Sequence, residues 1–189
     1  MKATIVLVGN TDAQNYGGKV LLEAHKLAKT GFEMTRLPFH VSLKQPFFIH
    51  DLKEFEAFFD KFARPVKPME IPFEEMVLSP NNSIGCIPSG CLALRATRTA
   101  ELDILQKRLF RELTEKFGPC PAEHDDDYIF HMTLAIGNAP YENYIQAYQH
   151  LKLKPIPKGF IFDKIALFYY DDDSIAAGTY FCYKSWDLK

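Results

Sequence analysis

Apolar residues recur at helical spacing in four segments of the chain, and this pattern predicts four amphipathic helices. The clearest segment is residues 51–65, where four phenylalanines fall on one side of the predicted helix. Asp51 is suited to cap that helix, and Pro65 is suited to end it. The other three segments are residues 17–29, 99–118 and 141–152.

Shorter runs of β-branched and aromatic residues, bounded by turn residues, predict eight strands. These runs are residues 3–9, 37–43, 72–79, 83–88, 90–97, 128–137, 159–173 and 175–186. Each half of the chain has a helix, a strand, a second helix and further strands, which is typical of an α+β fold with two sheets backed by helices. No segment reads as a linker, so we expect one domain over residues 1–189, made of two similar lobes.

Composition narrows the range of partners. The chain has 189 residues, of which 47% are hydrophobic, and a formal net charge of −2. Such a balance provides no general attraction for duplex DNA or for an anionic membrane, so an anionic ligand would need a local site. No run approaches the ~20 apolar residues of a membrane span. The four cysteines form no CxxC pair, so we expect a cytoplasmic protein with reduced thiols; a Cys86–Cys91 disulfide is the alternative.

One five-residue pattern occurs twice, as FHVSL at residues 39–43 and as FHMTL at residues 130–134. Because side chains alternate between the faces of a strand, His40 and Ser42 share one face, and His131 and Thr133 share one face of the second strand. The other face of each strand is apolar and suited to a core. The same alternation places Lys44 on the polar face of the first strand.

Two readings of these polar faces compete. In the simpler one, each histidine and its hydroxyl neighbour face water. In the other, the two copies place imidazoles in matching environments, where one acts as a base and the other as an acid. Cleavage of a phosphodiester without a metal requires such a pair, and an adjacent hydroxyl can donate a hydrogen bond to a non-bridging phosphate oxygen. The repetition favours the second reading.

The motifs HVSL (40–43) and HMTL (131–134), one in each half of a chain of this length, resemble those of the 2H phosphoesterase superfamily. That superfamily includes the proteins called 2′-5′ RNA ligases and cyclic nucleotide phosphodiesterases. The resemblance implies a bilobal, pseudo-twofold α+β fold with a central cleft. It also implies metal-independent hydrolysis of a cyclic phosphate or a 2′-5′ phosphodiester, without a cofactor.

The resemblance also assigns roles to residues. It implies that His40 and His131 are the catalytic acid–base pair and that Ser42 and Thr133 bind the phosphate. Lys44 is added as a substrate-binding residue because HVSLKQPF resembles the bacterial branch of the superfamily. Many members carry an Arg soon after the second motif, where this chain has Ala-Ile-Gly. We expect a monomer that acts on a nucleotide or an RNA end.

Other functions stay open at this point. A module that binds nucleotides or RNA ends without turnover is favoured by the departure after the second motif. A metal-dependent hydrolase would use the acidic clusters at residues 124–127 and 171–173, which exposed loops also carry for other reasons. Arg95 and Arg98 are each able to contact a phosphate, although a solvated arginine is the simpler interpretation of both.

Overall fold

The computed structural model describes residues 1–81, 87–171 and 179–189, and these form four α-helices, a short 3-10 helix and eight strands. The α+β class predicted from the sequence is confirmed. The helices are α1 (Thr11–Ala28), η1 (Glu33–Arg36), α2 (Leu52–Ala63), α3 (Ala100–Phe117) and α4 (Tyr141–Leu151). The strands are β1 (Lys2–Gly9), β2 (His40–Ser42), β3 (Phe47–Phe48), β4 (Met69–Asn81), β5 (Ser89–Ala96), β6 (His131–Ile136), β7 (Gly159–Tyr170) and β8 (Tyr180–Asp187).

All strand pairings are antiparallel and connect the strands into one sheet, in the order β3-β1-β2-β6-β5-β4-β7-β8. Strand β1 also pairs with β7 along its whole length. Six strands, β1-β2-β6-β5-β4-β7, therefore close into a ring, and β3 and β8 lie outside it. The two predicted sheets are joined within this ring: β2 meets β6 at one junction, and the start of β4 meets the start of β7 at the other.

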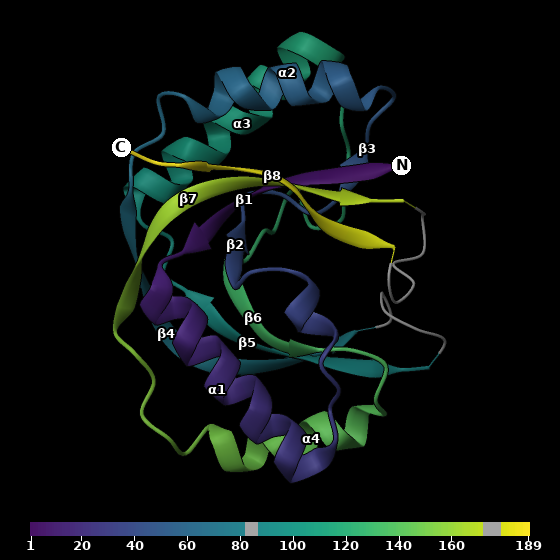
Figure 1. Cartoon of the computed structure of the whole chain (residues 1–189), viewed down its shortest axis with the longest axis vertical. Helices are drawn as coiled ribbons and strands as arrows, with labels where there is room; N and C mark the ends of the chain where they lie inside the picture. Colours follow the sequence, from purple (N-terminus) through teal and green to yellow (C-terminus); the bar gives the residue numbers. More distant parts are fainter. Residues whose placement is uncertain (82–86, 172–178) are drawn as a thin grey trace.

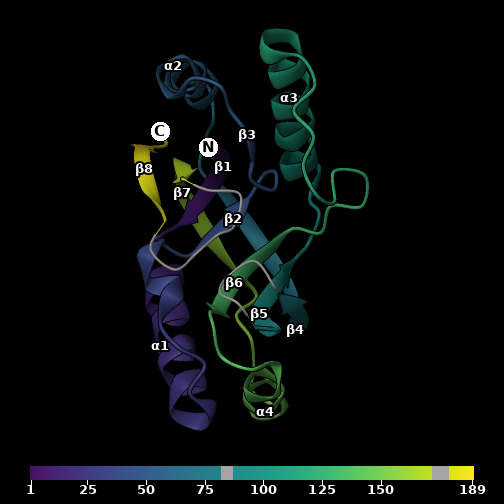
Figure 2. The same ribbon diagram turned by 90° about the vertical axis from the view of Figure 1, so that its right-hand side faces the viewer.

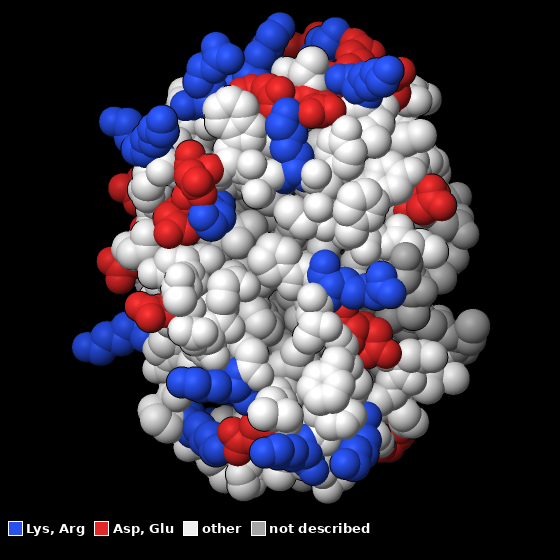
Figure 3. All heavy atoms as spheres, viewed as in Figure 1, with Lys and Arg blue, Asp and Glu red and all other residues white. Residues whose placement is uncertain are grey.

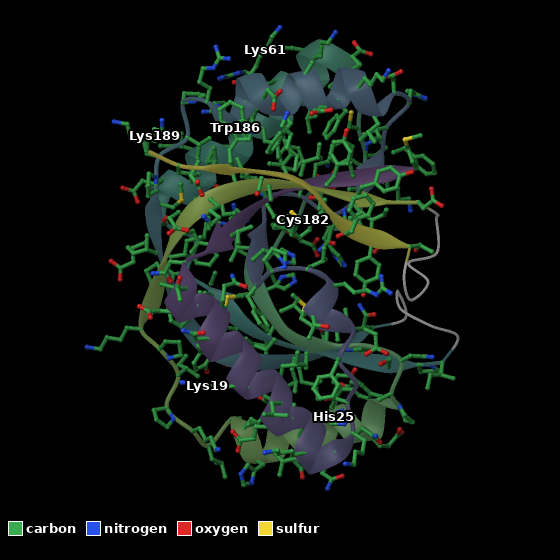
Figure 4. All side chains as sticks on the ribbon, in the orientation of Figure 1. Lys19, His25, Lys61, Cys182, Trp186 and Lys189 are labelled. Atoms are coloured by element: carbon green, nitrogen blue, oxygen red, sulfur yellow. The ribbon has the colours of Figure 1, made fainter. Side chains whose placement is uncertain are left out.

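The helices cover two opposite ends of the strand layer. Figures 1 and 2 show α2 and α3 at one end, α1 and α4 at the other, and the strands between them. In Figure 4, Lys61 on α2 and Lys19 on α1 mark these two ends, and Cys182 on β8 lies between them. None of the described helices is both long and apolar enough to cross a membrane.

Local sequence explains where most helices begin. The side chain of Asp51 accepts a hydrogen bond from the Glu54 amide at 2.7 Å, which caps α2, and the Thr99 hydroxyl caps α3 in the same way. Helix α1 begins at Thr11, earlier than the predicted residue 17, because Asn10 caps it through the Ala13 amide.

Several predicted strands differ from the observed ones by a few residues, and the short strand β3 was not predicted. Strand β2 is shorter than the predicted 37–43, since it spans only His40–Ser42. The predicted strand at residues 83–88 and the end of the one at 159–173 lie partly outside the described residues, as do Cys86 and the start of the run at 175–186.

Candidate active site

The two motif strands lie side by side and bring the histidines of both halves together. Val41 of β2 is the antiparallel partner of Met132 of β6, and both side chains are fully buried. Because antiparallel partners share a face, the residues on either side of this pair project to the opposite face. Continued by one residue, the register sets His40 opposite Thr133 and His131 opposite Ser42. Buried and half-buried side chains alternate along both motifs as predicted, and these four side chains are the half-buried ones.

Each imidazole is held by the same contact. The Nδ1 atom of His40 lies 2.8 Å from the Pro38 carbonyl oxygen, and Nδ1 of His131 lies 2.9 Å from the Ile129 carbonyl oxygen. A carbonyl oxygen can only accept, so Nδ1–H donates in both cases. The neutral rings therefore keep a lone pair on Nε2, which is the nitrogen left for a ligand.

The electrostatics of the two rings favour their neutral forms. Burial lowers the pKa of His40 from 6.5 to about 4, against the opposing hydrogen bond to Pro38, and the charge of His131 lowers it further. Burial also lowers the pKa of His131, and His124 acts in the same direction. The two imidazoles therefore interact electrostatically. An edge-to-face contact with Phe168, at 4.7 Å between ring centres, further fixes the His40 ring.

The two hydroxyl residues have different surroundings. Thr133 Oγ1 lies 3.6 Å from the sulfur of Cys91, a buried residue of β5. Burial raises the pKa of the Cys91 thiol to about 11, so the sulfur keeps its proton near neutral pH. A thiol that donates to Thr133 leaves the hydroxyl proton available to a ligand. Ser42 is held through its backbone, whose carbonyl accepts from the Tyr128 hydroxyl at 2.9 Å.

Lys44 does not join the imidazoles, and the prediction that it shares their polar face is corrected. Strand β2 ends at Ser42, and the Lys44 side chain is 1% exposed. Its ammonium forms an ion pair with Asp125 and lies 4.3 Å from the ring centre of Phe110 on α3. The amine is therefore engaged inside the protein, beside a helix, where it lines a cavity of about 200 Å³ with apolar residues of α3.

The acidic clusters have other contacts. Asp125 pairs with Lys44, and Asp127 lies 3.2 Å from Nδ1 of His124. Asp171 accepts a hydrogen bond from Tyr169, whereas Asp172 and Asp173 lie outside the described residues. Within the described part of the chain, no three His, Cys, Asp or Glu residues are grouped so that they could hold a metal ion.

Strand register shows which residues of β5 lie beside the second motif. Arg95 of β5 is the antiparallel partner of His131, and Ala93 is the partner of Thr133. Cys91 shares a face of β5 with Ala93, and its sulfur reaches the Thr133 hydroxyl. The apolar run after the Ser89-Gly90 turn predicts a strand at residues 90–97 but does not show which strand lies beside it, so neither neighbour was predictable.

The fold is shared by solved structures of low sequence identity. The Thermus thermophilus protein TT0787 superposes with a TM-score of 0.65 at 14% identity, and E. coli LigT, solved with 3′-AMP, superposes with 0.59 at 10% identity. Both comparisons cover 100% of this chain and 98% of the other. Usb1 of Kluyveromyces marxianus gives 0.51 at 13% identity, with 96% of each chain covered. No curated protein matches the sequence significantly.

The sequence itself matches a family model. Residues 22–174 match the model of the 2′-5′ RNA ligase superfamily, and this stretch includes both histidine motifs. The match covers most of the chain, and the α+β fold with its antiparallel sheet agrees with the LigT-like structures. The resemblance read from the motifs is thus confirmed, and the chain belongs to the 2′-5′ RNA ligase superfamily, a group of 2H phosphoesterases.

Proposed function

We propose that the protein is a metal-independent phosphoesterase that hydrolyses a cyclic phosphate or a 2′-5′ phosphodiester of a nucleotide or an RNA end. The observation that carries the proposal is the paired arrangement of His40 and His131. They come from adjacent antiparallel strands, are anchored through equivalent Nδ1 contacts and interact electrostatically. Family membership supports the reaction class, and the two motifs support the choice of residues.

The chemistry assigns opposite tasks to the two Nε2 atoms. One neutral imidazole removes a proton from the attacking water through its Nε2 lone pair. The other must carry a proton on Nε2; burial lowers its pKa, but the negative charge of a bound phosphate favours the protonated ring. That ring donates its proton to the ester oxygen as the bond to phosphorus breaks. Water adds to phosphorus, and the alkoxide leaves as an alcohol, so that one histidine gains a proton and the other loses one. Which histidine takes each part depends on the ester bond that is cleaved.

The hydroxyls complete the site. Ser42 and Thr133 lie on the same face as the imidazoles, and a hydroxyl there donates a hydrogen bond to a non-bridging oxygen as negative charge develops. The Cys91 contact supports this role for Thr133, because a donating thiol leaves the threonine proton free. The E. coli relative was solved with 3′-AMP, which is the kind of monophosphate that opening a 2′,3′-cyclic phosphate produces.

The proposal is tested by replacing each histidine. With 2′,3′-cyclic AMP as substrate, His40→Ala and His131→Ala should each lower kcat by about 10²–10⁴-fold, the range of general acid–base catalysis. The double variant should be no worse than the less active single variant, because the pair acts as one unit. Release of 2′- or 3′-AMP is measured by chromatography.

The matched control is His150→Ala, which removes an exposed histidine from α4. It should retain wild-type activity, and circular dichroism should show all variants folded. Hydrolysis of 2′,3′-cyclic AMP at the wild-type rate by both single variants would remove the proposal.

A second function, binding of an RNA end without turnover, is favoured by one observation. Directly after the second motif this chain has Ala-Ile-Gly, whereas many family members carry an arginine soon after that motif. A wild-type protein that binds 3′-AMP but releases no product from 2′,3′-cyclic AMP, 2′,3′-cyclic CMP or a 2′-5′-linked dinucleotide would support this function over hydrolysis.

A further inference from the structure

A row of side chains crosses three strands beside the candidate site. Glu75 of β4 is the antiparallel partner of Arg95 of β5, and Arg95 is the partner of His131 of β6. Partners across antiparallel strands share a face, so all three project to the face of the imidazoles. Leu94 and Met132, which are also partners, are fully buried on the opposite face.

The guanidinium of Arg95 has unused hydrogen-bonding capacity. Its NH1 atom lies 2.8 Å from a carboxylate oxygen of Glu75, and the two side chains are 41% and 53% exposed. The Nε atom is buried and has no hydrogen-bond partner among the residues that the structure describes. Because Nε is buried while the side chain is 41% exposed, the terminal nitrogens of the guanidinium are the donors that a ligand can reach. An exposed ion pair is weak, and its arginine readily exchanges the carboxylate for a phosphate.

The residue at the related position beside the other motif is apolar. Val8 of β1 is the partner of His40, as Arg95 is the partner of His131. On that side the nearest basic residue in the row is Lys164 of β7, one strand further away and paired with Asp187. A positive charge on the neighbouring strand therefore occurs beside His131 but not beside His40, so the two sides of the site differ in charge.

We propose that Arg95 binds a second phosphate of the substrate, so that the substrate class is an RNA end or short oligonucleotide with at least two phosphates. The inference rests on the proposed function and names the substrate class for the same site. Adjacent strands lie about 5 Å apart, so the backbone of Glu75 lies about 10 Å from that of His131, with Arg95 between them. Because the guanidinium contacts Glu75, it points away from His131 and from the reacting phosphate. This position suits a flanking phosphodiester.

The overall charge provides no general attraction for an oligonucleotide. The chain carries a net charge of −2, and on the face in Figure 3 the charged side chains gather mainly over the helices at the two ends. Much of the band between them is uncharged. An oligonucleotide therefore meets no broad basic surface on this face, and discrimination between one and two phosphates falls to individual cations such as Arg95.

The test measures binding of two reaction products, so it does not depend on turnover. Isothermal titration calorimetry would compare 3′-AMP with the dinucleotide ApAp, which adds one phosphodiester. Wild-type protein should prefer ApAp, and Arg95→Gln should reduce that preference about tenfold, the effect of one charge-assisted contact. Arg95→Lys keeps the charge but loses the planar fork, so it should fall between them. Glu75→Gln removes the competing carboxylate and should strengthen ApAp binding.

The matched control is Arg111→Gln, which removes an equally charged and largely exposed arginine from α3. It should leave both affinities unchanged. The inference is overturned if the wild-type protein binds the two probes equally or binds neither. It is also overturned if the preference for ApAp survives Arg95→Gln.

Failure of this inference is separable from failure of the proposed function. Loss of ApAp preference in Arg95→Gln combined with no hydrolysis of any cyclic phosphate would leave Arg95 as a recognition residue and remove the enzyme. Hydrolysis of a cyclic phosphate by the wild-type protein, combined with an ApAp preference that Arg95→Gln leaves unchanged, would support the enzyme and remove the role of Arg95.

Discussion

At the scale of single residues, the two histidine rings are oriented alike because each one contacts its own backbone in the same way. Each imidazole is held by the carbonyl two positions earlier in its own segment, so the contact depends only on a local backbone shape that both motifs share. The surrounding side chains then differ: Phe168 contacts one ring, and Arg95 is the strand partner of the other histidine. Similar positioning with different neighbours is what a base and an acid need.

Burial of His40 predicts that the protein loses stability in mild acid. The folded-state pKa is lowered from 6.5 to about 4, so between these values the unfolded chain binds a proton that the folded chain does not. The free energy of unfolding should therefore fall as the pH decreases through this window. His40→Gln, which cannot titrate, should lose less stability between pH 7 and pH 5 in urea unfolding. An identical pH dependence in both proteins would contradict the lowered pKa.

The sequence predicted the orientation of the motif residues but not all of their neighbours. Alternation was sufficient for His40 and Ser42 because they lie within a regular strand. It failed for Lys44, two positions later, because β2 had already ended and the chain bends. Whether a strand continues depends on the strands beside it, and a pattern of apolar residues does not contain that information.

At the scale of secondary structure, helix α1 fixes the position of the first motif. A Cβ atom on Gly17 would lie 2.5 Å from the ring of Phe39, the residue before His40. The helix therefore approaches β2 so closely that only glycine fits. Gln14 adds to the contact, since its side-chain amide bonds both the amide and the carbonyl of Phe39.

Two adjacent glycines in α1 give a matched pair of variants. Gly17→Ala should destabilise the protein by about 1–3 kcal/mol because the added methyl overpacks against Phe39. Gly18→Ala meets nothing within 4 Å and should stabilise the helix by about 0.5–1 kcal/mol. Urea unfolding measures both, and phosphoesterase activity should fall only in the first. Equal effects would show that Phe39 moves aside freely.

Helices were predicted more accurately than strands for a physical reason. The boundaries of α2 and α3 follow from a local cap and a local apolar face, as at Asp51 and Thr99. The start of α1 was predicted six residues too late, at Gly17, because the polar residues 11–16 lack an apolar face, whereas the Asn10 cap starts the helix at Thr11.

At the scale of the whole molecule, closure of the six-stranded ring brings distant segments together. The motif strands β2 and β6 begin 91 positions apart in the sequence, and the ring makes them neighbours. A second connection between these regions is the ion pair of Lys44 with Asp125, which joins the end of β2 to the segment before β6. The Tyr128 hydroxyl, bonded to the Ser42 carbonyl, is a third.

The Lys44–Asp125 pair is predicted to stabilise the fold rather than bind substrate. Asp125→Ala leaves a buried ammonium without its partner and should cost about 3 kcal/mol in urea unfolding. Combining it with Lys44→Met, which fills similar space without a charge, should recover most of that loss. The double variant should keep the wild-type KM for 2′,3′-cyclic AMP. A large rise in KM would return Lys44 to the substrate site.

The pairing of Val41 with Met132 bears on how such a protein could arise. Val41 and Met132 are equivalent positions of the two motifs, and their strands pair antiparallel, as two identical strands do across a twofold axis. A half-length ancestor could therefore have dimerised through this strand. Such a homodimer would already have set two imidazoles across its symmetry axis, one from each subunit. In a single chain each half can change independently, and here the strand partners of the two histidines differ, Arg95 beside His131 and Val8 beside His40.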